Sequence, residues 1–107
     1  AALKKDGIAV FQLGPFLDFD LIIRGIGRNL GKLFKHVNPF RLPMPSYSCG
    51  SEYCFLMASK KVNPSAVPVS QLRERARNRL GQQFSELKYY TPEMHQASLV
   101  MPKMWQL

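Results

Sequence analysis

Three side chains able to bind or react stand beside turn signals in this sequence: Gln12, Tyr47 and Cys49. Gln12 is the one polar residue near the end of the apolar run 8–13, and Tyr47 and Cys49 lie in the Pro-, Ser- and Gly-containing cluster 45–50. An amide, a phenol and a thiol in such places could hold a polar ligand, because loops at the end of a buried sheet commonly carry binding groups. On the residues alone, Gln12 fits better as a structural amide satisfied by backbone at a strand end.

These residues need a sheet to position them, and the apolar pattern predicts an α/β chain. We expect strands near residues 8–13, 33–42 and 53–59, and helices near residues 18–30, 70–80 and 92–98. The first run is continuously apolar, which is typical of a strand buried on both faces of a parallel sheet. The last two strands are joined without a crossover helix and should pair antiparallel. Pro39 places the middle strand at an edge or a bend.

Helix ends are marked by residues that commonly cap them. Asp18, Ser70 and Thr91 are predicted N-caps, and Thr91 is followed by proline and an acid, which favour a first helical turn. Gly81 should end the helix 70–80. The glycines between residues 25 and 31 fall inside a predicted helix, so they do not form a phosphate-binding loop.

Composition limits the class of protein. The 107 residues allow one small domain, 1–107, with one core. Two cysteines do not form a disulfide framework, and they favour a reducing intracellular compartment or organelle over secretion. His36 and His95 stand too far apart in sequence for metal-ligand spacing, so no metal is expected. The first residues contain neither an initiating methionine nor an apolar signal core, and we expect the chain to be a piece of a longer one.

The net charge of +8 points to an acidic partner. Its densest source is the predicted helix 70–80, which carries Arg73, Arg75, Arg77 and Arg79. These four arginines are our candidate basic interaction surface, and a solvated helix face is the simpler alternative. They surround the helix instead of forming a stripe, and no aromatic residue alternates with them. A nucleic-acid partner is therefore a distant third hypothesis.

Four short stretches, in order, resemble the C-terminal part of spermidine synthases, the polyamine aminopropyltransferases. The resemblance is carried by residues 2–8 with Gln12, by Pro-Ser-Tyr at 45–47 with Gly50, by 55–60, and by Leu-Lys-Tyr-Tyr at 87–90 with His95 and Leu-Val-Met-Pro at 99–102. The resemblance implies the C-terminal portion of a Rossmann-like, methyltransferase-type sheet with terminal antiparallel strands and flanking helices. It also implies transfer of an aminopropyl group from decarboxylated S-adenosylmethionine to putrescine.

The same resemblance implies that Gln12 and Tyr47 match residues lining the polyamine pocket, here vestigial. The family's donor-binding glycine loop, ribose-binding acid and catalytic aspartate match nothing in this chain and lie upstream in the family. No catalytic residue and no cofactor are therefore expected, and decarboxylated S-adenosylmethionine is a co-substrate only where that upstream part is present. The family follows its glutamine with a small residue and a glutamate, whereas Leu13 and Gly14 stand here.

Two hypotheses follow. In the first, the chain is a non-catalytic segment that acts as a structural or accessory subunit in a larger protein complex. In the second, it is a fragment of an active aminopropyltransferase that makes spermidine. A dicationic amine needs carboxylates to bind it and a base to take its proton. Seven acids against fifteen lysines and arginines, with only Glu52 close in sequence to Tyr47, favour the first hypothesis.

Overall fold

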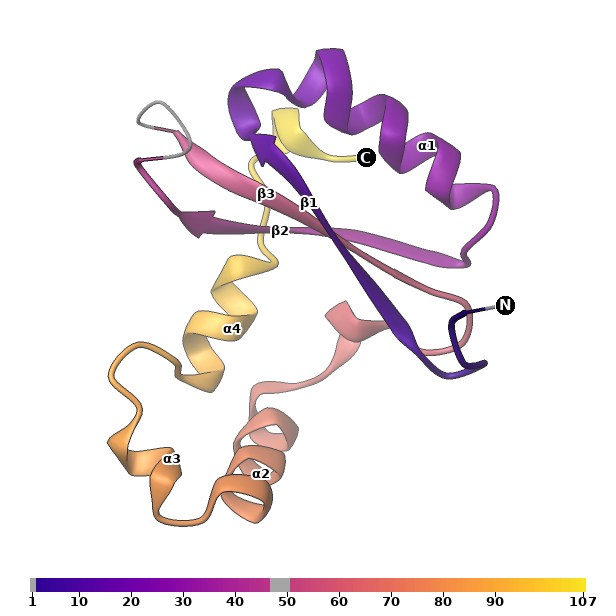
Figure 1. The fold of residues 1–107 in the computed structure, drawn as a ribbon. Coiled ribbons are helices and arrows are strands. Elements are labelled where there is room, and N and C mark those ends of the chain that lie inside the picture. Colours follow the sequence, from indigo (N-terminus) through magenta and orange to yellow (C-terminus); the bar gives the residue numbers. More distant parts are fainter. Residues whose placement is uncertain (1, 47–50) are drawn as a thin grey trace.

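The computed structural model describes residues 2–46 and 51–107, and it shows an α/β chain (Figure 1). A three-stranded sheet has the strand order β1-β3-β2. Its strands are β1 (Ile8–Pro15), β2 (His36–Pro43) and β3 (Glu52–Ser59). Within the described residues the α-helices are α1 (Arg24–Gly31), α2 (Val69–Leu80), α3 (Gln83–Glu86) and α4 (Pro92–Ser98).

Both strand pairings of the sheet are antiparallel. The antiparallel pairing of β2 with β3 confirms the prediction for these two strands. β2 is an edge strand, as predicted from Pro39, which has no backbone amide to donate to a neighbouring strand. The expectation for β1 is wrong in this structure, because β1 also pairs antiparallel, with β3. It is buried on one face only: Ile8 is 42% exposed and Val10 is 57% exposed. Continuous apolarity alone did not distinguish these two arrangements.

The predicted helix 18–30 is divided into three parts. A 3-10 turn (Phe16–Asp18) leads into a π-helical turn (Phe19–Ile23), which continues as α1. Asp18 is not an N-cap, because its side chain makes no capping hydrogen bond. The backbone amide of the next residue, Phe19, is bonded instead to the carbonyl of Phe16 in the preceding turn. The helix nevertheless ends at Gly31, as expected.

The capping predictions for α2 and α4 have mixed outcomes. Thr91 caps α4, since its hydroxyl accepts a hydrogen bond of 3.0 Å from the amide of Met94, and proline follows it at the first position. Gly81 ends α2 at a φ of 56°, which favours glycine. Ser70 is not the N-cap: α2 begins one residue earlier, because Pro68 holds an extended conformation and its carbonyl accepts the amide of Leu72.

The core lies between the sheet and the turns that precede α1. Phe16, Phe19, Ile23 and Cys54 form a buried cluster, on which Leu13, Met101 and Trp105 pack. Trp105 stacks on Phe16 with a ring-centroid separation of 4.6 Å. The C-terminal residues therefore complete the core that the N-terminal half begins.

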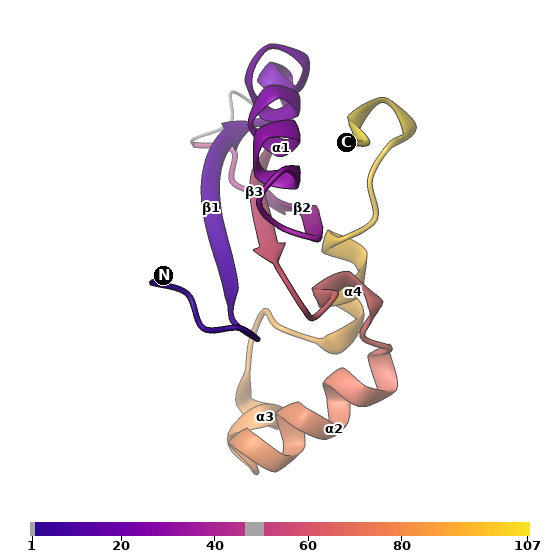
Figure 2. The ribbon, with the colours of Figure 1, turned by 90° about the vertical axis from the view of Figure 1, so that its right-hand side faces the viewer.

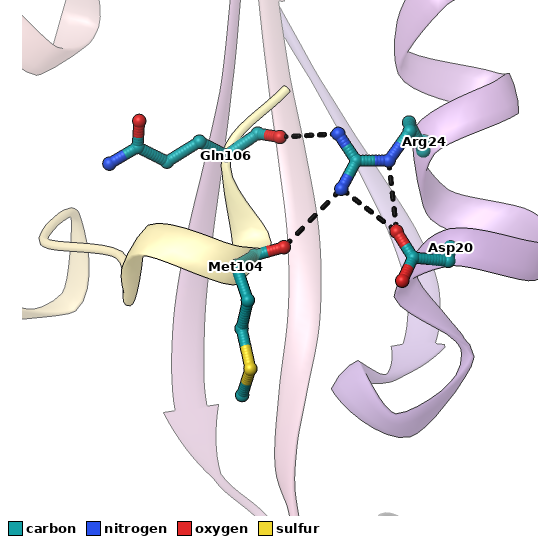
Figure 3. A network of polar contacts seen from close by, with 4 residues as sticks. All are labelled: Asp20, Arg24, Met104 and Gln106. Carbon is teal, nitrogen blue, oxygen red and sulfur yellow. Dashed lines mark hydrogen bonds and ion pairs between the residues drawn. The ribbon is translucent and has the colours of Figure 1, made fainter.

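Arg24 fixes this C-terminal segment to α1 (Figure 3). Its guanidinium donates to the main-chain carbonyls of Gln106 at 2.8 Å and Met104 at 3.3 Å. The side chain of Asp20, one turn earlier, accepts from the same guanidinium at 2.8 Å and 3.0 Å. Gly27 allows the approach, because a Cβ at that position would stand 2.7 Å from the side chain of Leu107.

Helix α4 lies between the sheet and the helices α2 and α3 (Figure 1). In both views α1 lies at one end, near the C-terminus, and α2 and α3 lie at the opposite end (Figures 1 and 2). An ion pair between Arg73 of α2 and Glu93 of α4 joins two of these helices. Within the described residues, no helix is both long and apolar enough to cross a membrane.

Candidate functional site

A β-bulge sets the position of Gln12. Gln12 lies opposite Phe55 and Gly14 lies opposite Cys54, so Leu13 is an extra residue in β1. Gly14 has a φ of 136°, a conformation that other residues rarely adopt. Leu13 packs against the core cluster, and Gln12 lies on the opposite, solvent-facing side of the sheet. Gln12 is exposed there instead of buried between two layers.

Gln12 is held by a neighbouring strand. Its Nε2 donates a hydrogen bond of 3.1 Å to the hydroxyl of Tyr53, in β3. The sequence prediction of a structurally satisfied amide is right in kind, but the partner is a side chain and not the backbone. Tyr53 was missed as a site residue, because the two side chains meet only through the register of β1 against β3, which places Gln12 opposite Phe55, two residues from Tyr53.

Aromatic rings continue from Tyr53 along this face of the sheet. The rings of Tyr53 and Phe55 are tilted by 55° with centroids 5.4 Å apart. Phe55 in turn stacks on Phe40 of β2, at 5.0 Å and 9°. We call Gln12, Tyr53, Phe55 and Phe40 the aromatic row. It joins the exposed amide on β1 to the far edge of the sheet.

The acid nearest to this row in the sequence, Glu52, is already paired. The Nη1 of Arg41 donates to both carboxylate oxygens of Glu52, at 2.7 Å and 2.9 Å, and the Nε of Arg41 donates to the carbonyl of Val100 at 2.7 Å. Both side chains are about one-third exposed, which limits the free energy that the pair adds to folding. Glu52 therefore offers little free charge to a dicationic amine.

A second polar pair lies where α4 begins. The hydroxyl of Tyr90 and the Nδ1 of His95 are 2.9 Å apart. Burial lowers the pKa of His95, so the neutral imidazole that can accept the tyrosine proton is favoured. The hydroxyl of Ser98 donates to the carbonyl of His95 at 2.7 Å. These contacts fix the orientation of α4 relative to the preceding segment.

The four arginines of α2 do not have equivalent surroundings. Arg73 is partly buried and bonded to Glu93, whereas Arg75, Arg77 and Arg79 are exposed. Among the described residues no ion pair involves these last three. Their use as an interaction surface stays a prediction.

The remaining candidate groups are the tyrosine and cysteines of the loop 45–50 and strand β3, and a metal site. Tyr47 and Cys49, with the rest of 47–50, lie outside the described residues. Cys54 is fully buried, and desolvation raises the pKa of its thiol to about 12, so it remains protonated at neutral pH. In the part of the chain that is described, no group of His, Cys, Asp and Glu side chains could hold a metal ion.

The arrangement defines an α/β protein whose candidate site is an amide and aromatic surface, with its nearby charges paired. No protein-family model matches the chain. The chain does match curated relatives. It is 35% identical over 103 residues to the polyamine aminopropyltransferase of Desulforudis audaxviator, and this match covers 95% of the chain and 33% of that relative. Identity is 38% over 104 residues to the Methanocaldococcus jannaschii enzyme and 33% over 103 residues to that of Bacillus subtilis.

The chain is homologous to polyamine aminopropyltransferases over nearly all of its length. This confirms the resemblance inferred from the four short motifs. The chain spans about one-third of the length of the curated relatives it matches. The polyamine-binding role of Gln12 and Tyr47 stays a prediction.

Proposed function

We propose that this chain is the C-terminal segment of a spermidine synthase-like protein and is non-catalytic as it stands. In this proposal it serves as a structural or accessory subunit whose surfaces are covered by another polypeptide. The observation that carries the proposal is the homology itself, which extends over nearly the whole chain yet covers one-third of each relative. The missing two-thirds would supply the donor site.

The exposed edge and face of β1 support the proposal that another polypeptide covers the sheet. β1 is an edge strand, with Ile8 and Val10 exposed on the face that also carries Gln12. An uncovered edge presents unpaired amides and carbonyls, and exposed apolar side chains favour association. In the proposed arrangement a further strand pairs with β1, and the three strands complete a Rossmann-like sheet. Such an interface would exceed the roughly 1,200–2,000 Å² of a standard protein contact.

The charge of the chain supports an acidic neighbour beside α2. Arg75, Arg77 and Arg79 are exposed, and the chain carries a net charge of +8. The ion pair between Arg73 and Glu93 shows how a carboxylate is held against this helix. An acidic surface on the covering polypeptide would neutralise the three remaining arginines in the same way.

The polar pairs of the candidate site support the absence of catalysis. Gln12 donates to Tyr53, and the carboxylate of Glu52 is bound by Arg41. Aminopropyl transfer to a diamine needs carboxylates for the cationic ends and a base for the attacking nitrogen. The described residues around Gln12 offer neither in a free state.

Light scattering coupled to size-exclusion chromatography tests the open surface directly. The 107-residue chain should show a mass above that of a monomer, rising with concentration, because its uncovered face associates with itself. The variant V10K should move towards a monomer, since it places a charge on that face. The control L21K changes a residue that is 86% exposed on the π-helical turn and should behave like the parent chain. A parent chain that stays monomeric at every concentration and unfolds cooperatively would contradict the proposal.

The alternative, a fragment of an active aminopropyltransferase, is supported by the same homology. It predicts that adding the part of the Bacillus subtilis relative that the match does not cover restores spermidine formation. Complex formation without turnover would favour the structural role instead. Turnover in the mixture would favour the alternative.

A further inference from the structure

A cavity lies between the sheet and α4, at the Phe40 end of the aromatic row and away from Gln12. It has a volume of about 370 Å³. Phe40, Leu42 and Met57 line it from the sheet, and Tyr89, Met94 and Leu99 line it from the last third of the chain. Ligand cavities commonly begin at about 300 Å³ and are lined mostly by apolar side chains.

Residues at both ends of α4 are held in place. Pro92, at the start of α4, is fully buried, and the carbonyl of Val100, just beyond its end, accepts the bond from Arg41 of β2. The stack of Phe40 on Phe55 fixes the ring that forms part of the cavity wall. Both ends of α4 are therefore held by features that do not depend on a ligand.

The charged groups of the lining and most of its neutral polar groups already have partners, and the Tyr89 hydroxyl is a neutral group on a side chain that is 58% exposed. Arg41 binds Glu52, the hydroxyl of Tyr90 contacts His95, and the Ser98 hydroxyl donates to the main chain of α4. A charged ligand would have to lose its water without gaining a free counter-charge, which is costly. An uncharged ligand meets no such cost.

The shape of the lining favours a flat molecule. Phe40 and Tyr89 offer ring faces and edges, and the thioethers of Met57 and Met94 adapt well to aromatic neighbours. A cavity of about 150 Å³ holds a single benzene ring, so this one is large enough for two fused rings.

We propose that the cavity between β2, β3 and α4 is a binding site for a small, uncharged aromatic molecule. The cavity lies beside the surface on which the proposed subunit role depends, and this inference does not rest on that role. The proposed ligand is not a polyamine. A polyamine carries several positive charges, and Glu52, the carboxylate among the described lining residues, is already paired with Arg41.

Indole is a suitable probe, since it is uncharged and has two fused rings, and indoleacetate is its charged counterpart. Binding is followed by the NMR signals of isotope-labelled methionine methyl groups. The background is I8K, which also places a charge on the exposed face of β1 but lies opposite Ser59, outside the lining. Indole should shift Met57 and Met94 in a saturable manner and leave the exposed Met104 unshifted. Indoleacetate and putrescine should bind at least about tenfold more weakly, because of the desolvation of their charges.

A cavity-filling variant and its control locate the site. A97W places a large ring at the lining and should abolish the indole-induced shifts of Met57 and Met94. A66W introduces the same side chain at an exposed position outside the lining and should leave them intact. Should A97W fail to fold by circular dichroism, the smaller A97L replaces it, with weakened binding expected. Absence of saturable shifts, equal binding of indoleacetate, or unchanged indole binding in the folded A97 variants would each overturn the proposal.

Discussion

The amide nitrogen of Gln12 donates a hydrogen bond of 3.1 Å to the hydroxyl of Tyr53 across the pairing of β1 with β3. The bond links the residue predicted to line a polyamine pocket to an aromatic residue of the central strand. It occupies one donor of the amide, on a residue that is exposed. A ligand at Gln12 would therefore meet an amide already oriented by the sheet.

Removing the Tyr53 hydroxyl tests this link. Y53F should lower the free energy of unfolding by about 0.5–1 kcal/mol, at the low end for a hydrogen bond because Gln12 is exposed. Urea unfolding at neutral pH measures the change. The matched control Y89F removes a hydroxyl from a tyrosine that is 58% exposed and should be neutral. Equal effects of the two variants would argue against the bond.

The glycine of the bulge gives a second prediction. G14A should destabilise the chain by about 1–3 kcal/mol, because a φ of 136° strains any residue with a Cβ. Added volume is not the cause, since a Cβ at that position has no atom within 4 Å. G25A is the control, because it also meets open space but lies in α1, where alanine is favoured. Thermal unfolding of both variants makes the comparison, and a stable G14A chain would contradict the strained bulge.

The guanidinium of Arg24 should hold the C-terminal segment in place. R24M should cost about 1–2 kcal/mol, since it removes charge-assisted bonds to two carbonyls from a side chain that is 29% exposed. Hydrogen exchange of residues 102–107 should accelerate, and the fluorescence of Trp105, the one tryptophan, should shift as it leaves Phe16. R28M, one turn further along α1, should change neither quantity. Unaltered exchange in R24M would show that packing alone holds the segment.

His95 should make stability depend on pH. Burial lowers the pKa of His95 in the folded state, so the unfolded chain binds the proton more readily. The free energy of unfolding should therefore decrease as the pH falls below the ordinary histidine pKa of about 6.5. Protonation also removes the acceptor for the Tyr90 hydroxyl. Urea midpoints at about pH 7.5 and about pH 5.5 should differ less in H95Q than in the parent chain. H36Q should retain the full difference, and a parent-like response in H95Q would assign the effect to other groups.

The elements that depend on local pattern were predictable from the sequence. The strand 53–59 follows from a short apolar run next to turn residues, the edge position of Pro39 from a missing amide, and the Thr91 cap from a side-chain acceptor, all of which are local. The face exposed by β1 was not predictable, because apolarity does not tell whether another layer covers a strand. The start of α2 was missed by one residue because Pro68 fixed it.

The candidate site was predictable only in part. Gln12 was found because it is the polar residue in an apolar run, but Tyr53 and Arg41 were not. Their roles depend on strand register: that of β1 against β3 for Tyr53, and that of β2 against β3 for Arg41. The pairing of Pro43 with Glu52 brings Arg41 close to that carboxylate, and a register guess for the hairpin would have suggested this pair.

The central claim is that this chain does not catalyse aminopropyl transfer as it stands. Its most direct test is an assay with isotopically labelled putrescine and decarboxylated S-adenosylmethionine, with product separated from substrate by chromatography. The purified 107-residue chain should form no labelled spermidine beyond a boiled control. Labelled spermidine that exceeds this control and increases with the amount of chain would contradict the claim.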